Sequence, residues 1–354
     1  MRKPQKNQPN VAVKTGRAFL KVITALIAFL LLLIVAAGAV IWVFVKGPSP
    51  TMQRDFVLTV KETSAVGFLA NIFLTDAEIE RIIGEPETEE DLYEIDVTLI
   101  NIPSAKPPIP PPGVHIDSEE LPEEYEPPED IDEIEIVRVV GSGYLGYMMI
   151  VHDPMRLFVG TPSNLGGRGM TLMDMVERTG AVAGINAGGF FDPGGGGTGG
   201  IPDGIVIADG KLAWGAGSGS TSVIGFDADG ILHVGTMTAA AAVNLNLQWA
   251  VSFGPTLISN GVAHNLQRSG INPRTAIGQR ADGAVLLLVV EGRQIDSLGA
   301  TFDDLIEIFL DFDAVNAANL DGGSSTLMMF EDEIINRSAS VVGPRNLPTS
   351  FLVR

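Results

Sequence analysis

The sequence contains no cysteine, and only four of its 354 residues are histidine. Without cysteine there can be no disulfide bond, no zinc site with thiolate ligands and no catalysis by a thiol. The histidines are scattered at positions 115, 152, 233 and 264, and the motifs HExxH and GxSxG do not occur. A zinc protease or a Ser-His-Asp hydrolase therefore has no support in the sequence.

Positive charge is also scarce over most of the chain. The formal net charge is −20, yet residues 1–46 carry seven Lys or Arg and no acid. The remaining 16 basic and 43 acidic residues leave −27 on everything that follows. A nucleic-acid partner needs a basic surface, so we expect none.

One long stretch has no charge at all, and it runs from Val22 to Val45. A helix of this length reaches about 36 Å, which is enough to cross a hydrocarbon core of about 30 Å. We expect a cytoplasmic basic tail (1–21) and a single-pass transmembrane anchor (22–45), with everything after it extracellular, because positive charge precedes the span. A cleaved signal peptide is the alternative, since Ala36–Ala39 offers small residues, but the apolar residues continue through Val45.

Two connecting segments follow the anchor. Residues 46–84 predict a short helical, membrane-proximal stalk, in which Thr75 caps a helix. Residues 85–133 form an acidic, Pro-rich linker, which we expect to be extended and to hold the following domain away from the membrane. A ligand for a Pro-recognising partner is the alternative reading of the Pro-rich sequence.

The folded body is expected at 134–354. Apolar runs flank Gly141–Gly146, and this match to GxGxxG predicts a hairpin because a strand, not a helix, follows it. Met170–Arg178 has helical spacing and ends at Gly180. The predicted class is α+β: a mixed, largely antiparallel β-sheet core with a few packed helices, preceded by an N-terminal transmembrane helix.

A polar turn near the C-terminus is the most informative segment. Asn319 and Asp321 alternate along a predicted strand and share one face, while Leu320 points to the core. Gly322 and Gly323 allow close approach of a ligand, and the hydroxyls of Ser324 and Ser325 follow them. The segment predicts a cradle for an anion or a sugar, the alternative being a surface turn capped by Asp and Ser.

Two further segments repeat this pattern of polar groups at strand ends. A buried strand leads into Asn186, followed by Gly188, Gly189 and a glycine-rich loop that is either disordered or closes over a ligand. Further on, Arg274 and Thr275 begin a strand whose hairpin partner ends at Glu291 and Arg293. The two arginines and Glu291 are therefore expected at the same open end. A surface salt bridge is the alternative for these charges.

These motifs, in their order and spacing, resemble the phosphodiester glycosidase family. That family includes the uncovering enzyme, which removes N-acetylglucosamine from the mannose 6-phosphate signal, and many bacterial exopolysaccharide biosynthesis proteins. The resemblance covers about residues 134–353 and rests on Asn186–Phe190, Pro273–Ala276, Glu291–Arg293, Gly299–Thr301 and Asn319–Thr326. Two departures stand out: the family usually has Asp where this chain has Glu291, and often a third Gly before Ser324.

The resemblance implies an extracytoplasmic hydrolase that cleaves glycosyl phosphodiesters in cell-surface glycans or wall polymers. It makes Asp321 and Glu291 the candidate catalytic carboxylates, with no cofactor expected and metal binding left open. The candidate substrate-binding residues are Asn186, Gly188, Gly189, Arg274, Thr275, Arg293, Asn319, Gly322, Gly323, Ser324 and Ser325. A non-catalytic glycan-binding or envelope-assembly protein and a metal-dependent phosphodiesterase are the alternatives.

Overall fold

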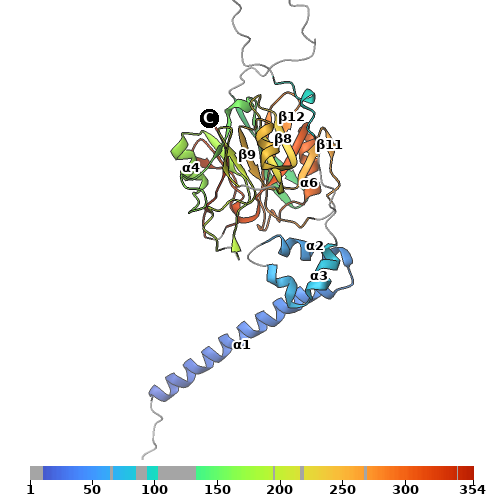
Figure 1. Cartoon of the computed structure of the whole chain (residues 1–354). Helices are drawn as coiled ribbons and strands as arrows, with labels where there is room; N and C mark the ends of the chain where they lie inside the picture. The colour runs from blue at the N-terminus through green and yellow to red at the C-terminus, as the bar shows by residue number, and fades with distance from the viewer. Residues whose placement is uncertain are drawn as a thin grey trace, which may run out of the picture.

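The structure is a computed structural model, and it describes residues 11–63, 67–84, 94–102, 133–193, 196–215, 219–266, 269–340 and 342–354. It shows a β-rich domain with a few short helices, joined through a small helical module to one long N-terminal helix (Figure 1). All strand pairs within its sheets are antiparallel. The predicted fold class is confirmed.

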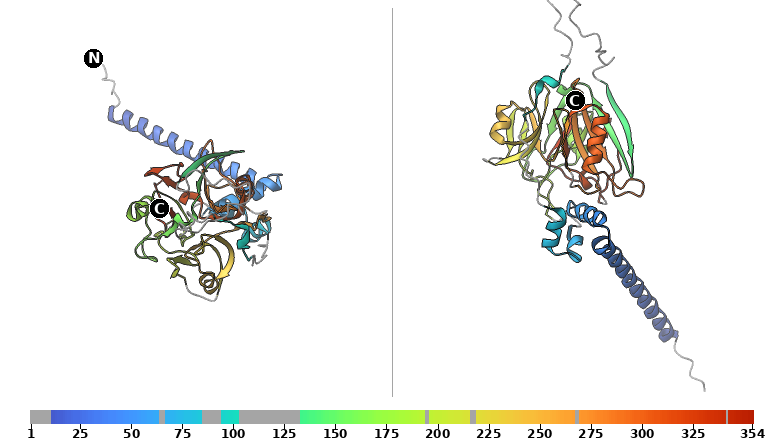
Figure 2. Two further views of the ribbon diagram at one scale, coloured as in Figure 1. Left: turned by 90° about the horizontal axis from the view of Figure 1, so that it is seen from above. Right: turned by 90° about the vertical axis from the view of Figure 1, so that its right-hand side faces the viewer.

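The long helix, α1, spans Val11–Lys46 and points away from the sheets in every view (Figure 2). Within the described residues it is the one helix that is long and apolar enough to cross a membrane, over Phe19–Lys46. The predicted span at 22–45 lies inside this stretch.

A compact helical module follows α1, and we define it as α2 (Pro50–Lys61) with its C-cap Glu62 and the next residue Thr63, η1 (Gly67–Ile72) and α3 (Asp76–Ile83). Its core also contains Val45 of α1, and Lys46 forms an ion pair of 2.8 Å with Glu78 of α3. The predicted cap at Thr75 is present as a capping box. Shared burial and this ion pair join the module to the end of α1.

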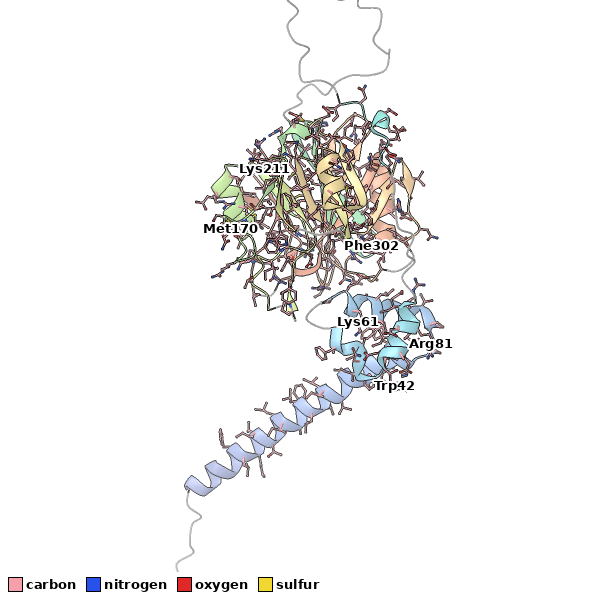
Figure 3. The ribbon with its side chains drawn as sticks, in the orientation of Figure 1. Trp42, Lys61, Arg81, Met170, Lys211 and Phe302 are labelled. Carbon is pink, nitrogen blue, oxygen red and sulfur yellow. The ribbon has the colours of Figure 1, made fainter. Side chains whose placement is uncertain are left out.

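The module contacts the β-rich domain directly. The amide of Gly270 donates to Glu62 Oε1 at 2.7 Å, and the amide of Ile271 donates to Thr59 Oγ1 at 3.0 Å. Figure 3 shows this region, in which Lys61 marks the end of α2. Glycine at 270 is required, because a Cβ there would come within 2.4 Å of the Thr59 backbone.

A second N-terminal segment also lies on the domain. Residues 94–102 contain η2 (Val97–Leu99), and the amide of Asn101 donates to the Ala281 carbonyl at 2.7 Å. The amide of Asp96 donates to Asn260 Oδ1 at 2.8 Å. These contacts hold residues 94–102 on the domain. The flanking stretches 85–93 and 103–132 lie outside the described residues.

Three sheets build the domain. The seven-stranded sheet has the order β1 (Ile134–Gly141), β2 (Tyr144–Val151), β13 (Val285–Val290), β12 (Arg274–Arg280), β14 (Ala314–Leu320), β10 (Thr256–Ser259) and β11 (Val262–Ala263). One five-stranded sheet has the order β16 (Glu333–Ile334), β15 (Met328–Phe330), β4 (Ala183–Asn186), β17 (Ser350–Val353) and β3 (Leu157–Gly160). The other has the order β6 (Lys211–Trp214), β5 (Val206–Ala208), β9 (Trp249–Ser252), β7 (Ser220–Phe226) and β8 (Leu232–Thr238).

The main core lies among the three sheets and includes Leu287, Val289, Phe226 and Phe351. Helices cover the outer faces: α6 (Phe302–Asp311) packs on the first sheet, α4 (Leu172–Thr179) on the second and α5 (Ala239–Asn244) near β8 and β6. Strand β13 is apolar at every position because both of its faces are covered. Each large apolar side chain buried in this way contributes about 1.5–3 kcal/mol.

Short turns behave as the sequence predicts. Gly141–Gly146 joins β1 to β2 in a hairpin, and Gly180 ends α4 in the left-handed conformation with φ of 69°. Thr301 caps α6 in a capping box with Asp304. Two further short helices lie in the described residues, η3 (Pro154–Arg156) and η5 (Gly323–Ser325), and η5 begins three residues after the end of β14.

Candidate active site

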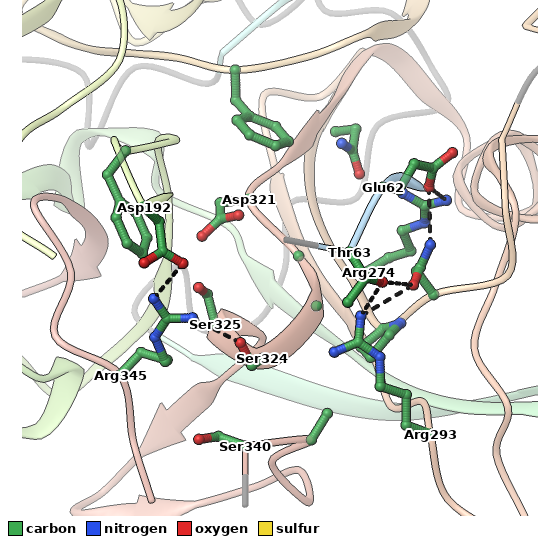
Figure 4. A pocket seen from close by; sticks show the side chains of 18 of the residues that line it. Glu62, Thr63, Asp192, Arg274, Arg293, Asp321, Ser324, Ser325, Ser340 and Arg345 are labelled. Carbon is green, nitrogen blue, oxygen red and sulfur yellow. Dashed lines mark hydrogen bonds and ion pairs between the residues drawn. The ribbon is translucent and has the colours of Figure 1, made fainter. Parts of the chain in front are cut away.

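A pocket of about 740 Å³ lies where the ends of β12 and β14 meet the helical module (Figure 4). It brings together segments that are far apart in the sequence. Its lining includes Glu62, Thr63, Phe190, Asp192, Phe253, Arg274, Arg293, Asn319, Asp321, Gly322, Gly323, Ser324, Ser325 and Arg345. This lining contains seven of the eleven predicted substrate-binding residues and one of the two predicted catalytic carboxylates, Asp321.

Strand β14 presents Asn319 and Asp321 to the pocket, and the intervening Leu320 is buried in the core. The Asn319 amide nitrogen donates to the Gly254 carbonyl at 2.7 Å, whereas its Oδ1 is buried with no hydrogen-bond partner. Asp321 Oδ2 is likewise buried and unpartnered. Two acceptor atoms on one strand face are thus left free for donors of a ligand, because buried polar groups are nearly always paired.

The environment of Asp321 changes its acidity. The pKa of Asp321 is raised to about 7, mainly by burial and to a smaller extent by the charges of Asp192 and Asp203. A hydrogen bond with Ser325 and the charge of Arg345 oppose this rise in the pKa. A carboxyl group with a pKa near neutrality is suited to general acid or base catalysis.

Beside Asp321, Asp192 is held by Arg345. Their Oδ2 and Nη2 atoms are 2.7 Å apart, and the two side chains are only 11% and 17% exposed. Arg345 also donates to Ser324 Oγ at 2.9 Å and stacks on the Phe190 ring at 5.3 Å. The charge of Asp192 is therefore balanced, and Arg345 links the loop after β4 to Ser324 of η5.

On the opposite side of the pocket, Arg274 is almost completely enclosed. Its side chain is 7% exposed and lies 4.4 Å over the Phe302 ring. It donates to the carbonyls of Ala300 at 3.0 Å and Gly270 at 2.6 Å, and to Glu62 Oε2 at 2.9 Å. Arg274 is thus a buried cation whose counter-ion comes from the helical module.

Arg293 lies next to Arg274 but has a different environment. It donates to Thr63 Oγ1 at 2.9 Å and to Asn272 Oδ1 at 3.2 Å, and both of these acceptors are neutral. Burial lowers the pKa of Arg293, as does the charge of Arg274. In the ion pairs found among the described residues, Arg293 has no carboxylate partner. Its charge is available to an anionic ligand.

Glycine 323 places the turn beside this arginine. Its φ is 61°, and a Cβ at this position would lie 3.5 Å from Arg293 Nη2. At Gly322 a Cβ would come within 2.6 Å of the Pro273 carbonyl oxygen, so only glycine fits. The two glycines let the backbone of η5 lie between the carboxylate side and the arginine side.

Comparison with known proteins identifies the domain. The family model described as phosphodiester glycosidase matches residues 179–354. These residues belong to the phosphodiester glycosidase family. The resemblance read from the sequence is confirmed.

Individual relatives are distant. Over 193 residues the chain is 30% identical to the SPbeta prophage-derived uncharacterized protein YomE of Bacillus subtilis, covering 52% of this chain and 29% of that protein. Over 209 residues it is 29% identical to N-acetylglucosamine-1-phosphodiester alpha-N-acetylglucosaminidase of Mus musculus, covering 52% of this chain and 40% of that protein. The chain therefore spans less than half the length of these curated relatives.

A solved structure supports the fold. The catalytic domain of zebrafish N-acetylglucosamine-1-phosphodiester alpha-N-acetylglucosaminidase, described as auto-inhibited by its pro-peptide, aligns with a TM-score of 0.53 at 22% identity. The alignment covers 62% of this chain and 82% of that structure. The match to the family model begins at residue 179, but the preceding segment belongs to the same sheets. Strand β2 pairs with β13, β3 pairs with β17, and β1 pairs with β2.

Several predicted residues support the pocket of the phosphodiester glycosidase domain from behind. Asn186 is fully buried, donates to the Asp321 carbonyl and accepts from Thr275 Oγ1 at 2.8 Å. The amide of Gly188 donates to Thr349 Oγ1 at 2.9 Å, and a Cβ at Gly189 would come within 2.6 Å of the Phe253 ring. None of these four residues is part of the pocket lining. They position Asp321 and Phe253.

Glu291 does not line the pocket. Its side chain is 1% exposed and accepts from the amide and the Nε of Arg337, each at 2.7 Å. Arg337 is in turn 3.0 Å from Asp296. The structure thus gives Glu291 an ion-pair partner outside the pocket, and we do not retain it as a catalytic candidate.

Six polar residues of the pocket lining were not predicted from the sequence: Glu62, Thr63, Asp192, Asn272, Ser340 and Arg345. Asp192 lies two residues after the Asn186–Phe190 motif, so its proximity to that motif was an available signal. Glu62 and Thr63 carried no such signal, because 212 residues separate Glu62 from Arg274. Within the described residues, no three His, Cys, Asp or Glu side chains are grouped so that they could hold a metal ion.

Proposed function

We propose that this domain hydrolyses glycosyl phosphodiesters by cleaving the bond between the anomeric carbon and the phosphate oxygen. The observation that carries the proposal is the pairing of Asp321 and Arg293 in one pocket. Asp321 is a carboxyl with an unpartnered, buried Oδ2 and a pKa raised to about 7, and Arg293 is a cation whose partners among the described residues are neutral acceptors. The first suits a reacting centre and the second a phosphate.

In this mechanism the phosphate group binds on the Arg293 side and the sugar lies over Asn319 and Asp321. Hydroxyl groups of the sugar donate to Asn319 Oδ1, which lacks a partner. The phenyl rings of Phe190 and Phe253 line the same region and provide apolar surface for the sugar ring. The glycine turn at 322–323 connects the two sides, so one ligand can contact both.

The chemistry follows from the leaving group. A phosphate monoester departs with the bonding electron pair as a stable anion, so it needs little acid assistance. Asp321 instead accepts a proton from a water molecule as the water oxygen bonds to the anomeric carbon, and its raised pKa makes it a stronger base than an ordinary carboxylate. Arg293 stabilises the charge that develops on the phosphate. The products are a free sugar and a phosphate monoester.

The names of the mammalian relatives suggest the first substrate to test, an alkyl ester of N-acetylglucosamine 1-phosphate. The purified chain should release free sugar and alkyl phosphate. Hydrolysis in oxygen-18 water should label the sugar and leave the phosphate unlabelled. Label in the phosphate, or activity abolished by EDTA, would favour a metal-dependent phosphodiesterase. Binding without turnover would favour a glycan-binding or envelope-assembly role.

We also propose that α1 is a membrane anchor with its N-terminus in the cytoplasm, which places the domain outside the cell, where surface glycans and wall polymers are its substrates. The support is the apolar stretch Phe19–Lys46 together with the six basic residues before position 22. Protease added to intact cells should then digest the domain. If the domain is protected from the protease, it lies on the cytoplasmic side and the proposed orientation is wrong.

A further inference from the structure

Glu62 comes from outside the sheets that build the pocket, yet its carboxylate is fully engaged there. It accepts from the amide of Gly270 at 2.7 Å, from Asn272 Nδ2 at 3.0 Å and from Arg274 Nη2 at 2.9 Å. Its side chain remains 26% exposed and lines the pocket (Figure 4). A carboxylate in a pocket expected to bind an anion requires an explanation.

The charges on this side of the pocket provide one. Arg274 and Arg293 bring two positive charges and Glu62 brings one negative charge, while Thr63 and Asn272 add only neutral groups. Counted over the described residues, the arginine side therefore has a net charge of +1. A phosphodiester carries a single negative charge, whereas a phosphate monoester approaches two above its second pKa of about 6.

We propose that Glu62 determines the charge specificity of the pocket, so that it accepts the singly charged diester and disfavours the doubly charged monoester. This inference rests on the proposed function, because hydrolysis at the anomeric carbon converts the first kind of anion into the second. Glu62 repels the single negative charge of the diester, and it repels the two negative charges of the monoester product about twice as strongly. The helical module thereby promotes release of the product that the arginines would otherwise retain.

The geometry requires that Glu62 stays in place while the substrate binds. Its three donors are fixed groups of the domain, and Arg274 would be a buried cation without a counter-ion if Glu62 left. Removing one partner of a buried ion pair is strongly destabilising. Thr63, the next residue, at the same time holds Arg293 through its hydroxyl. Glu62 and Thr63 are therefore fixed parts of the pocket lining, which stay in place when a ligand binds.

The test measures the binding of two probes to the full chain in detergent by calorimetry at pH 8. Methyl phosphate represents the dianion and dimethyl phosphate the monoanion. Glu62→Gln removes the charge and keeps the shape, and Glu80→Gln is the matched control, because Glu80 is exposed on α3 of the same module and does not line the pocket. Glu62→Asp keeps the charge and shows whether any change follows charge or packing.

We expect Glu62→Gln to strengthen binding of methyl phosphate relative to dimethyl phosphate by at least about tenfold. Glu80→Gln and Glu62→Asp should leave the ratio unchanged. In turnover of the sugar phosphodiester, Glu62→Gln should increase inhibition by the monoester product.

Three results would overturn the inference. An unchanged ratio in Glu62→Gln would show that its charge is not felt by the ligand. Equal strengthening of both probes would show that Glu62 is a plug that the ligand displaces. A ratio that changes equally in Glu62→Asp would assign the effect to packing. If the parent chain still hydrolyses the sugar phosphodiester, these results leave the proposed function intact, whereas a parent that neither binds the probes nor turns over substrate contradicts both.

Discussion

The two sides of the pocket differ in how their charges are balanced. On the carboxylate side, Asp192 is paired with Arg345 at 2.7 Å, whereas Asp321 keeps an unpartnered oxygen. On the arginine side, Arg274 is paired with Glu62 at 2.9 Å, whereas the acceptors that Arg293 contacts in the described part of the chain are neutral. Each side thus has one charge balanced by an ion pair and one left available to a ligand.

This difference separates structural charges from functional ones. A buried ion pair fixes geometry, because moving or removing either partner leaves the other as a buried charge without a counter-ion, which destabilises the fold. A charge without an opposite partner remains able to interact with a substrate and to change its protonation. We therefore expect Asp321 and Arg293 to act on the substrate, and Asp192, Arg345, Arg274 and Glu62 to hold the site in shape and set its charge.

The largest expected effect is that of Asp321→Asn. The variant is nearly isosteric but cannot accept a proton, so kcat should fall by at least about a hundredfold. Release of free sugar from the N-acetylglucosamine phosphodiester measures this loss. An active variant would move the catalytic role to another carboxylate, with Asp192 the first candidate because it lines the same pocket.

The same variant should become more stable than the parent as the pH rises. The pKa of Asp321 is about 7 in the folded protein, above its ordinary value of 3.8, so between these pH values the folded state holds a proton that the unfolded state has released. The free energy of unfolding of the parent therefore falls as pH increases from about 4 to 7, by up to ~4 kcal/mol. Asp321→Asn has no carboxyl group at this position, so its free energy of unfolding should not decrease for this reason over the same pH range. Thermal midpoints of both chains at pH 4 to 8 measure the difference, and parallel curves would contradict the raised pKa.

A smaller effect is expected for arginine-to-lysine changes, which differ between the two arginines. Arg293→Lys keeps a charge but loses the planar fork, so KM should rise by about tenfold with little change in the thermal midpoint. Arg274→Lys loses hydrogen bonds inside the fold and should lower the free energy of unfolding by about 1–3 kcal/mol. If Arg274→Lys instead raises KM at an unchanged thermal midpoint, and Arg293→Lys changes neither quantity, then Arg274 binds the substrate and Arg293 does not.

The sequence predicts those parts of the site that follow from strand geometry. Alternation along β14 places Asn319 and Asp321 on one face and Leu320 on the other. The antiparallel pairing of Arg274 with Val290 brings Arg274 and Arg293 to the same end of a hairpin. These relations depend on short-range periodicity, which a single sequence contains.

Other parts depend on contacts that periodicity does not encode. Strand β13 ends at Val290, so alternation no longer decides where Glu291 and Arg293 point. Arg293 takes a left-handed conformation with φ of 59° and lines the pocket, whereas Glu291 is bound by Arg337. Glu62 reaches the site through docking of the helical module, over 212 residues of sequence separation from Arg274. Only the folded arrangement reveals such pairs.

The smallest effect on activity is expected for Glu291→Gln, which tests whether a paired carboxylate is structural. The amide keeps one oxygen that can accept from the Arg337 backbone, now at 2.7 Å, but it loses the charge that binds the guanidinium. Because Glu291 is 1% exposed, losing this charge-assisted contact should cost about 1–3 kcal/mol of stability, while kcat/KM stays within about threefold. Asp296→Asn is the matched control, since Asp296 pairs with the same Arg337 but is 62% exposed and should change stability less. A hundredfold loss of kcat in Glu291→Gln at an unchanged thermal midpoint would instead make Glu291 a catalytic residue, and the distinction between paired and unpaired charges in this pocket would fail.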